Sequence, residues 1–323
     1  MVKAIIGEAY GPPEKVLHLK EVEMPVPKED QVLLKVHAAS VNISDYFGIS
    51  GIARLLGGGI RRPKDPRCGG DVAGKVEAVG AKVTRFRPGD EVFGAAFGSF
   101  AEYAVAPEAK LAPKPANVSF EDAAAVPVAG LTALQCVRDK GHVKDGLEVV
   151  VNGASGGVGT FTVQVAKSFG AQVTGVCSTR NVDQTRAIGA DHVVDYTKED
   201  FTRDGRSYDL ICDIAGNRSV SDYKRALKSG GTCLIVGFAG NPIMGLLKFA
   251  VLGKLGTIGG DKKVKFMGIC KINAEDLGVM AGLLAAGKVK PVIEKRYMLA
   301  ETPQALQYIS EKHTRGKNII TVS

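Results

Sequence analysis

One glycine-rich stretch limits the folds open to this chain more than any other feature of its sequence. The run VVVNGASGGVGTF, residues 149–161, places four glycines within seven positions directly after an apolar segment. We expect a buried strand at 147–152, a tight loop, and a helix at 160–169. Ala154, Gly156 and Gly159 form the pattern A-x-G-x-x-G. Small residues at these positions suit either a phosphate cradle at a helix N-terminus or a purely structural tight turn.

The surroundings of this loop decide between the two. Between residues 122 and 270, short and nearly continuous apolar runs alternate with amphipathic segments. Such alternation is typical of a parallel sheet covered by helices on both faces, and in that context the glycine pattern favours a bound dinucleotide. The sequence therefore predicts an α/β, Rossmann doubly wound cofactor domain. The predicted cofactor contacts in the loop are Ala154, Ser155, Gly156, Gly157, Val158 and Gly159.

The segment after the second predicted strand indicates which dinucleotide binds. An NAD site usually presents Asp or Glu there, but this chain reads GVCSTRN at 175–181, without an acid. Ser178 and Thr179 offer hydroxyl donors, and Arg180 offers a guanidinium that suits a 2′-phosphate. A solvated position at the start of a helix is the other role open to Arg180. Tyr196, at the end of the third predicted strand, is placed to reach the same end of the cofactor, so we expect NADPH.

The first third of the chain follows a different pattern. Short β-rich runs bounded by Gly, Pro or Asp are typical of a compact antiparallel, barrel-like domain. The pattern changes near Ser119, which precedes Glu121 and Asp122. A serine followed by acids in the first turn predicts a helix that begins there.

Composition argues against several other classes of function. The 42 basic and 34 acidic side chains give a net charge of +8, but the basic residues are scattered, so we expect no nucleic-acid partner. The six cysteines contain no CxxC pair and are expected to be reduced core residues. No signal-peptide core begins the chain, and we expect a cytoplasmic location. The apolar region 243–260 falls short of a membrane span, which leaves a lid helix or a peripheral membrane contact open.

A set of motifs extends along nearly the whole chain: HAASVNISDYFG, GGDVAGKVEAVG, RFRPGDEVFG, FAEYAVAP, AAAVPVAGLTAL, GASGGVG, IGADHVVDY and GKNII. Together they resemble the medium-chain dehydrogenase/reductase superfamily, and within it the zinc-free, quinone oxidoreductase-like branch. The resemblance implies a GroES-like, mostly antiparallel β-barrel catalytic domain at 1–121 and 271–323, with the Rossmann domain at 122–270. It also implies a homodimer that reduces quinones or α,β-unsaturated carbonyls with NADPH.

The chain departs from the zinc-dependent members at the positions that bind metal. Asn42 stands where those members have a cysteine ligand, and Gly70 and Asp71 stand where they have a His-Glu pair. The next ligand position, in AVPVAG, is apolar, and the four-cysteine lobe of a structural zinc is missing. Zinc needs three or four S, N or O donors, so we expect no catalytic zinc. Without a Lewis acid, a conjugated acceptor is easier to reduce than a simple alcohol is to oxidise.

The resemblance and the predicted positions assign roles to further residues. Asn42 would orient the nicotinamide ribose or donate to the substrate oxygen. Tyr46 would line the pocket and relay a proton, or serve only in packing, and Asp45 would fix its loop rather than act as an acid or base. Further predicted cofactor contacts are Thr132, Gly237, Phe238 and Lys317. Phe238 stacks on the nicotinamide or belongs to the core, and Lys317 approaches the cofactor or lies on the surface.

Two other functions are compatible with these motifs. One is an NADPH-binding sensor or interaction protein with little turnover, because no dedicated proton donor is evident. The other is an alcohol dehydrogenase with an unconventional metal site. Turnover and metal analysis distinguish these alternatives from a zinc-independent reductase.

Overall fold

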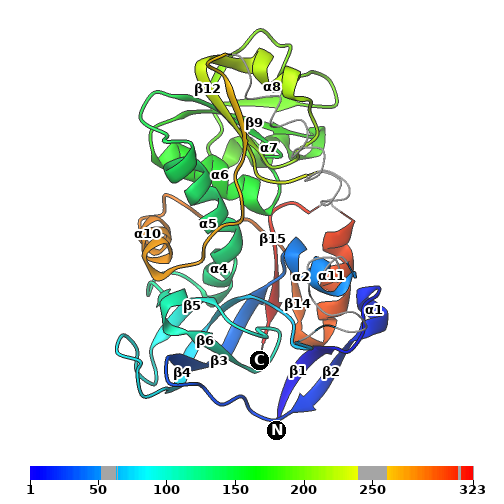
Figure 1. The fold of residues 1–323 in the computed structure, drawn as a ribbon, viewed down its shortest axis with the longest axis vertical. Coiled ribbons are helices and arrows are strands. Elements are labelled where there is room, and N and C mark those ends of the chain that lie inside the picture. Colours follow the sequence, from blue (N-terminus) through cyan, green and yellow to red (C-terminus); the bar gives the residue numbers. More distant parts are fainter. Residues whose placement is uncertain (52–62, 64, 239–259, 312–313, 323) are drawn as a thin grey trace. The chain divides into compact units, whose positions relative to one another are not determined.

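The computed structural model describes residues 1–51, 63, 65–238, 260–311 and 314–322, and it divides into two compact units (Figure 1). The first unit comprises Met1–Leu131, Ile272–Gly287 and Pro291–Ser323, and the second comprises Thr132–Lys271 and Lys288–Lys290. The first unit is thus discontinuous in sequence. It also includes residues 122–131, which the sequence analysis placed in the cofactor domain.

The second unit is built on a six-stranded parallel sheet with the order β10-β9-β8-β11-β12-β13. Its strands are β8 (Glu148–Asn152), β9 (Gln172–Cys177), β10 (His192–Asp195), β11 (Tyr208–Asp213), β12 (Leu227–Ile235) and β13 (Lys263–Phe266). Numbered within the unit, this order is 3-2-1-4-5-6, the order of a doubly wound dinucleotide-binding fold. The predicted Rossmann-type domain is confirmed.

Local sequence explains why these strands and helices form. Val149, Val150 and Val151 in β8 are fully buried, and β-branched runs of this kind suit a strand covered on both faces. Helix α6 (Gly157–Ser168) packs against β8 and β9, α7 (Val182–Ala187) against β9 and β10, and α8 (Val220–Ala226) against β12 and β13. The start predicted for α6, residue 160, was three residues late. Glycine's low helix propensity suggested a longer loop, whereas Gly157 already belongs to the helix.

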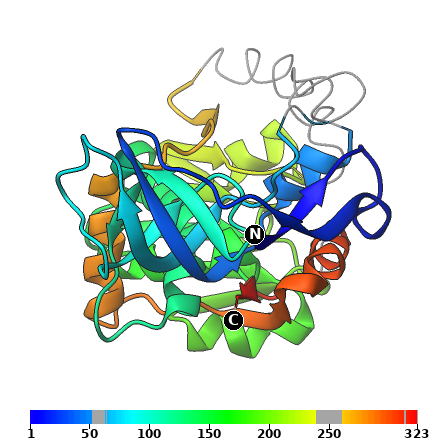
Figure 2. The same cartoon turned by 90° about the horizontal axis from the view of Figure 1, so that it is seen from below.

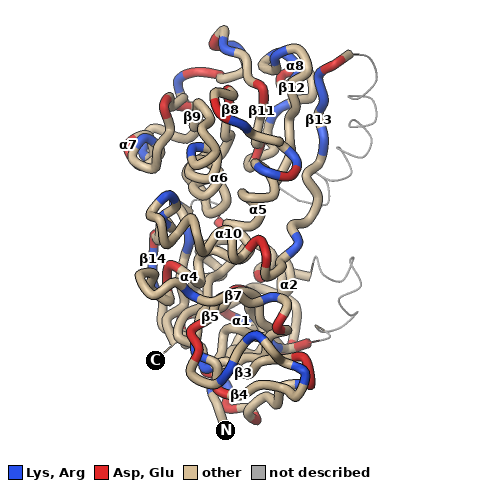
Figure 3. The backbone as a smooth tube through the Cα atoms, turned by 90° about the vertical axis from the view of Figure 1, so that its left-hand side faces the viewer, with Lys and Arg blue, Asp and Glu red and all other residues tan. Residues whose placement is uncertain are grey.

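Among the strands that the structure describes, β13 lies at one edge of the parallel sheet and carries basic residues. Lys263 and Lys265 are exposed on it, and Figure 3 shows blue along β13. Charged side chains on an edge strand oppose its pairing with another chain.

The first unit contains a seven-stranded sheet with the order β14-β15-β3-β4-β5-β7, in which β6 also pairs with β3. Its strands are β3 (Gln31–Ser40), β4 (Asp71–Val79), β5 (Glu91–Ala95), β6 (Tyr103–Pro107), β7 (Leu111–Pro113), β14 (Ile293–Met298) and β15 (Lys317–Thr321). A separate antiparallel pair joins β1 (Val2–Gly7) and β2 (Leu17–Val22). Among the described strands of this sheet only β14 and β15 pair in parallel, so the mostly antiparallel sheet is confirmed. Pairing among the described residues leaves β7 and β14 as edges, and closure into a barrel stays a prediction.

Helices complete the first unit. The described ones are α1 (Pro13–Val16), α2 (Ile43–Ile49), α4 (Phe120–Ala124), α10 (Ala274–Ala285) and α11 (Thr302–Ser310), while α5 (Pro127–Leu134) crosses the boundary to the second unit. Helix α4 contacts β3, β4, β5 and β15, and this packing accounts for the shift of the boundary beyond residue 121. Ser119 Oγ accepts a hydrogen bond from the Asp122 N–H, which confirms the predicted helix start. Figure 2 shows the orange helix α10 beside the strands of this unit, and it packs against β7.

Two composition-based expectations can be compared with the structure. Cys136, Cys177, Cys212 and Cys233 are buried, as predicted, whereas Cys68 and Cys270 are only half-buried. Among the helices that the structure describes, none has the length and apolar character needed to cross a membrane. The apolar segment 243–260 lies, except for Gly260, outside the described residues.

Candidate functional site

The glycine loop joins β8 to α6 at the carboxyl edge of the parallel sheet. Gly156 is the N-cap of the 12-residue helix α6 and provides no side-chain cap. A Cβ atom on Gly156 would meet nothing nearer than 3.8 Å, whereas one on Gly159 would lie 2.0 Å from the Gly153 carbonyl oxygen. Gly159 therefore lets the loop close on itself, and Gly156 leaves space at a helix N-terminus, where anions bind favourably.

Ser155 and Ser178 are brought together by a residue that the sequence analysis missed. Asn181 Nδ2 donates to Ser155 Oγ at 3.0 Å and to Ser178 Oγ at 3.2 Å. Asn181 directly follows the segment 178–180, which contains predicted cofactor contacts. Only 4% of the Asn181 surface is exposed. Its proximity to Ser155 in the glycine loop depends on the folding of both segments, so the local pattern gave no signal for it.

Thr179 is held by a second residue that was missed, Asp195. Asp195 is paired with Cys177 in the parallel register of β10 and β9, and its carboxylate accepts from Thr179 Oγ1 at 2.6 Å and from Thr197 Oγ1 at 2.7 Å. These hydroxyl groups, Thr179 first, lower the pKa of Asp195 to about 2. The Thr179 hydroxyl already donates its hydrogen bond to Asp195. This arrangement therefore does not support Thr179 as a donor to a phosphate.

Arg180 and Tyr196 lie at the ends of neighbouring strands. Arg180 follows β9 and is exposed, and Tyr196 follows β10 with 53% of its surface exposed. Ligands of open parallel sheets bind outside the carboxyl ends of the strands. Both side chains are therefore on the edge of the sheet where a nucleotide would be expected.

A buried carboxylate orders the loop after β11. Asp213 Oδ1 accepts from Asn152 Nδ2 at 2.7 Å and from the Gly216 N–H at 3.0 Å, and Oδ2 accepts from the Tyr223 hydroxyl. Burial raises the pKa of Asp213. A Cβ on Gly216 would lie 2.1 Å from the Gly237 carbonyl oxygen, so the loop after β11 packs tightly against the segment after β12.

The segment after β12 contains two of the predicted cofactor contacts. Gly237 and Phe238 are half-buried. The Phe238 ring stacks on Phe266 with centroids 5.6 Å apart and packs against the buried core of this unit. The structure therefore supports the core role for Phe238. Thr132, another predicted contact, is half-buried in α5.

Asn42, Asp71 and Lys317 form a buried cluster in the first unit. Asn42 Nδ2 donates to Asp71 Oδ2 at 2.8 Å, and Lys317 Nζ donates to Asn42 Oδ1 at 2.6 Å. Lys317 Nζ also lies 3.6 Å from Asp71 Oδ2, and Ser40 Oγ donates to the same carboxylate at 2.8 Å. The surface role considered for Lys317 is wrong, because only 3% of this residue is exposed. The Asn42 amide is held at both ends, so its orientation is fixed.

Burial and charge oppose each other in this cluster. Burial raises the pKa of Asp71, and the nearby ammonium of Lys317 opposes that shift. Burial likewise lowers the pKa of Lys317, and Asp71 opposes that change. Two buried charges of opposite sign therefore depend on one another, as expected of a desolvated ion pair.

Asp45 and Tyr46 lie at the start of α2, next to this cluster in sequence. The Asn42 N–H donates to Asp45 Oδ2 at 2.7 Å and forms a capping box with it. This contact supports the predicted loop-fixing role of Asp45. Tyr46 is half-buried against the core of the first unit, and this contact favours its packing role.

We expect Asp45 to make the stability of the protein depend on pH. Burial raises the pKa of Asp45 from 3.8 to about 7. The folded state therefore binds a proton where the unfolded chain has lost it, and the free energy of unfolding falls as pH rises from about 4 to about 7. Asp45→Asn should remove about 1–2 kcal/mol of this fall. The effect is no larger because Asp45 is half-buried and solvent screens part of it.

Urea unfolding at pH 5 and pH 7.5 measures the Asp45 effect. Asp90→Asn, a change at a carboxylate whose side chain is 36% exposed in the same unit, is the control. Equal pH dependence in wild type and Asp45→Asn would contradict the prediction.

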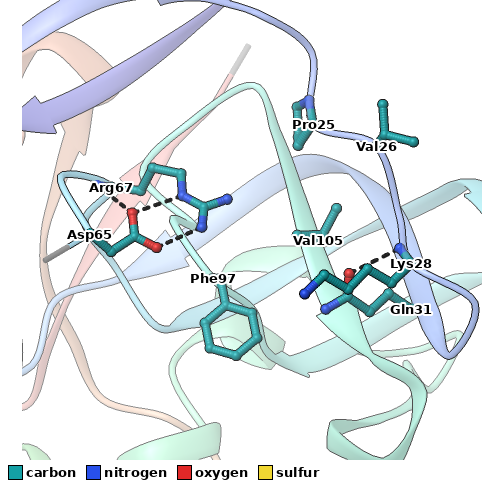
Figure 4. Close-up of a pocket in the computed structure, with 8 residues that line it drawn as sticks. All are labelled: Pro25, Val26, Lys28, Gln31, Asp65, Arg67, Phe97 and Val105. Carbon is teal, nitrogen blue, oxygen red and sulfur yellow. Dashed lines mark hydrogen bonds and ion pairs between the residues drawn. The ribbon is translucent and has the colours of Figure 1, made fainter.

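A surface pocket of about 380 Å³ lies elsewhere in the first unit (Figure 4). The Asp65 carboxylate and the Arg67 guanidinium, which are 2.5 Å apart, form an ion pair in its wall. Its lining residues are Pro25, Val26, Lys28, Gln31, Asp65, Arg67, Phe97 and Val105. None of them is a predicted site residue, so this pocket is separate from the candidate site.

The positions that resemble zinc-ligand positions carry a different chemistry. The Asn42 amide and the Asp71 carboxylate are engaged by the ammonium of Lys317, and a cation already compensates the carboxylate. Within the described ranges there is no group of three or more His, Cys, Asp or Glu side chains that could hold a metal ion. These donors do not fit the thiolate and imidazole set that zinc prefers.

Comparisons with known proteins agree with this architecture. Residues 28–116 match the family model of the alcohol dehydrogenase GroES-like domain, and residues 188–320 match the model described as zinc-binding dehydrogenase. The chain is 33% identical to a chloroplast envelope quinone oxidoreductase homolog of Arabidopsis thaliana, over 99% of this chain and 98% of that protein. It is 29% identical to a mitochondrial NAD(P)H oxidoreductase of Mus musculus, over 100% of this chain and 89% of that protein.

A solved structure extends the comparison to three dimensions. The quinone oxidoreductase from Coxiella burnetii is 30% identical and matches with a TM-score of 0.87, over 100% of this chain and 99% of that one. Both domains of the chain, and nearly its full length, are thus shared with these relatives. The chain belongs to the medium-chain dehydrogenase/reductase superfamily of oxidoreductases, in its quinone oxidoreductase-like branch.

Proposed function

We propose that the protein is an NADPH-dependent, zinc-independent reductase. It transfers a hydride to a quinone or to the activated C=C bond of an α,β-unsaturated carbonyl. The observation that carries the proposal is the glycine loop at the carboxyl edge of the parallel sheet, where a Cβ on Gly156, the N-cap of α6, would meet no atom nearer than 3.8 Å. Relatives named quinone oxidoreductase support the choice of acceptor.

The residues of the second unit fit an NADPH molecule. The loop 154–159 would hold the pyrophosphate, and Ser178 and Arg180 would contact the 2′-phosphate. Asp195 is compatible with this assignment, because its carboxylate already accepts hydrogen bonds from the Thr179 and Thr197 hydroxyl groups. A bound reduced nicotinamide supplies the hydride, and the protein binds and orients it.

We assign Asn42, in the buried cluster of the first unit, the donation of a hydrogen bond to the substrate oxygen. Lys317 and Asp71 fix the Asn42 amide, and hydrogen bonding rather than a metal would stabilise the negative charge on the acceptor oxygen. We assign no dedicated acid, because Tyr46 is packed against the core. Solvent supplies the proton that completes the reduction.

Arg180→Ala is expected to raise the KM for NADPH about tenfold or more and to leave the KM for NADH nearly unchanged. The reason is the loss of a charge-assisted contact to a phosphate that only NADPH carries. The measurement is the loss of reduced-nicotinamide absorbance with ortho-quinones, para-quinones and enones. Arg87→Ala, at a guanidinium whose side chain is 88% exposed in the first unit, is the control.

Three experimental results would change the proposal. Preference of the wild type for NADH would overturn the 2′-phosphate assignment. Tight NADPH binding without turnover across the panel would instead favour a sensor or interaction protein. Metal-dependent oxidation of alcohols would overturn the zinc-independent mechanism.

Two further parts of the proposal concern assembly and location. We propose a homodimer, and the lysines on β13 make direct pairing of two copies along that edge unfavourable. Sedimentation of the purified protein measures its oligomeric state. We also propose a cytoplasmic location, although similar proteins include forms named for the chloroplast envelope and the mitochondrion.

A further inference from the structure

One buried amide joins the two segments that carry predicted phosphate contacts. Ser155 lies in the loop between β8 and α6, and Ser178 directly follows β9. These strands are neighbours in the sheet. Asn181 reaches both hydroxyl groups with its Nδ2 atom, at 3.0 and 3.2 Å, while only 4% of its own surface is exposed. A single side chain thus sets the relative position of the two hydroxyls.

The direction of these hydrogen bonds determines what the hydroxyls can bind. An amide N–H only donates, so both Oγ atoms accept from Asn181 and each hydroxyl keeps its own hydrogen. None of the described residues accepts either hydrogen. A phosphate oxygen only accepts hydrogen bonds. Two hydroxyl groups that each have a hydrogen available to donate are therefore suited to bind an anionic ligand. Thr179, the neighbour of Ser178, differs because it donates to Asp195.

The other end of the amide meets no partner in the part of the chain that the structure describes. Asn181 Oδ1 is buried and makes no hydrogen bond with any described residue. An unsatisfied buried acceptor costs roughly 1–3 kcal/mol, so stability alone does not account for this orientation. The reversed amide would satisfy Oδ1 with both hydroxyl hydrogens, and it would then direct those hydrogens away from a ligand.

We propose that Asn181 is a positioning residue for nucleotide recognition. It holds Ser155 ready to donate to the pyrophosphate and Ser178 ready to donate to the 2′-phosphate. Asn181 thereby contributes to the choice of NADPH over NADH without touching the reacting atoms. This inference rests on the proposed NADPH-binding function, and it adds a residue that the sequence motifs do not assign.

The test uses nucleotide fragments that carry one or both of the relevant phosphates. Dissociation constants are measured by calorimetry for adenosine 2′,5′-bisphosphate and adenosine 5′-monophosphate, and by fluorescence for NADPH and NADH. Asn181→Asp keeps the side-chain volume but can only accept when ionised, so it should capture both hydroxyl hydrogens. We expect it to weaken 2′,5′-bisphosphate binding about tenfold or more and to reduce the preference over the monophosphate.

Two further variants separate positioning from general damage to the fold. Asn181→Leu should also reduce the preference for the 2′-phosphate. In the presence of Ser178→Ala it should reduce this preference little further, because Asn181 acts through the Ser178 hydroxyl that Ser178→Ala removes. Asn117→Leu is the control, because it removes a hydrogen bond from the Asn117 side chain to the Ala285 carbonyl oxygen in the first unit. It should leave the preference for the 2′-phosphate unchanged. Thermal unfolding without nucleotide verifies that each variant is folded.

The outcomes distinguish this inference from the proposed function. If the wild type binds none of the nucleotides, the proposed function fails and the inference fails with it. If the wild type favours the 2′-phosphate and both Asn181 variants keep that preference, only the inference is overturned. Additive losses in Asn181→Leu and Ser178→Ala would also overturn it, since Asn181 would then not act through Ser178. Should Asn181→Leu fail to fold, the isosteric Asn181→Asp decides the question.

Discussion

Gly159→Ala is expected to destabilise the protein by about 1–3 kcal/mol and to abolish measurable NADPH binding. The new Cβ would lie 2.0 Å from the Gly153 carbonyl oxygen and 2.9 Å from backbone atoms of Ala154. Backbone atoms cannot swing aside as a flexible side chain can. The loop must therefore open, and the N–H groups that it presents to a phosphate move with it. Denaturant unfolding and nucleotide fluorescence measure the two effects.

Gly156→Ala is the matched control, and it should separate binding from stability. Nothing lies within 3.8 Å of its added Cβ, so we expect a change in unfolding free energy of less than about 0.5 kcal/mol. Nucleotide affinity should still fall, because the methyl group occupies the space through which a phosphate approaches the backbone. Wild-type affinity in Gly156→Ala would show that the pyrophosphate does not approach the loop at this position.

The second large effect is expected at Lys317. Lys317→Met should lower the free energy of unfolding by about 3–5 kcal/mol, because it leaves the Asp71 carboxylate buried without a compensating charge. Asp71 is fully buried, and its distance to Lys317 Nζ is 3.6 Å. The same change leaves Asn42 Oδ1 without its donor, so the amide should lose its fixed orientation and kcat should fall as well.

A double-mutant cycle tests the origin of this loss. Adding Asp71→Asn to Lys317→Met removes the stranded charge and should recover part of the lost stability. Urea unfolding of the wild type, both single variants and the double variant gives the coupling. Strictly additive losses would show that Lys317 and Asp71 stabilise the fold independently, contrary to the prediction.

Local signals explain what the sequence predicted well. The valine run of β8 and the glycines after it specify a strand, a tight loop and a helix within about twenty residues, and no distant contact is needed to recognise them. The same holds for the helix start at Ser119, where serine and two acids stand side by side. The fold class of the second unit and the strand, loop and helix around the glycines therefore followed from short windows of sequence.

Residues that depend on distant contacts escaped prediction. Asp195 lies beside the segment after β9 because β9 and β10 pair in parallel. The local sequence HVVDY at 192–196 does not indicate which residues of β9 it will pair with. Burial of Lys317 likewise depends on the insertion of β15 between β14 and β3. The division of the two units at Leu131 and Thr132 falls inside α5, and α4 before it packs on strands of the first unit. In each case the decisive partner lies far away along the chain or in the packing of a whole sheet.

The position of β15 also has a consequence for the order in which the protein can be built. Lys317 and Asn42 are 275 positions apart, and the whole of the second unit is translated between them. While the ribosome translates the second unit, β3 lacks its neighbour β15, and the Asp71 carboxylate lacks the ammonium of Lys317. The second unit is complete by residue 290, so it can fold first, as domains commonly do during synthesis. The N-terminal part of the first unit then lacks one strand of its sheet until β15 has been translated, after the second unit is complete.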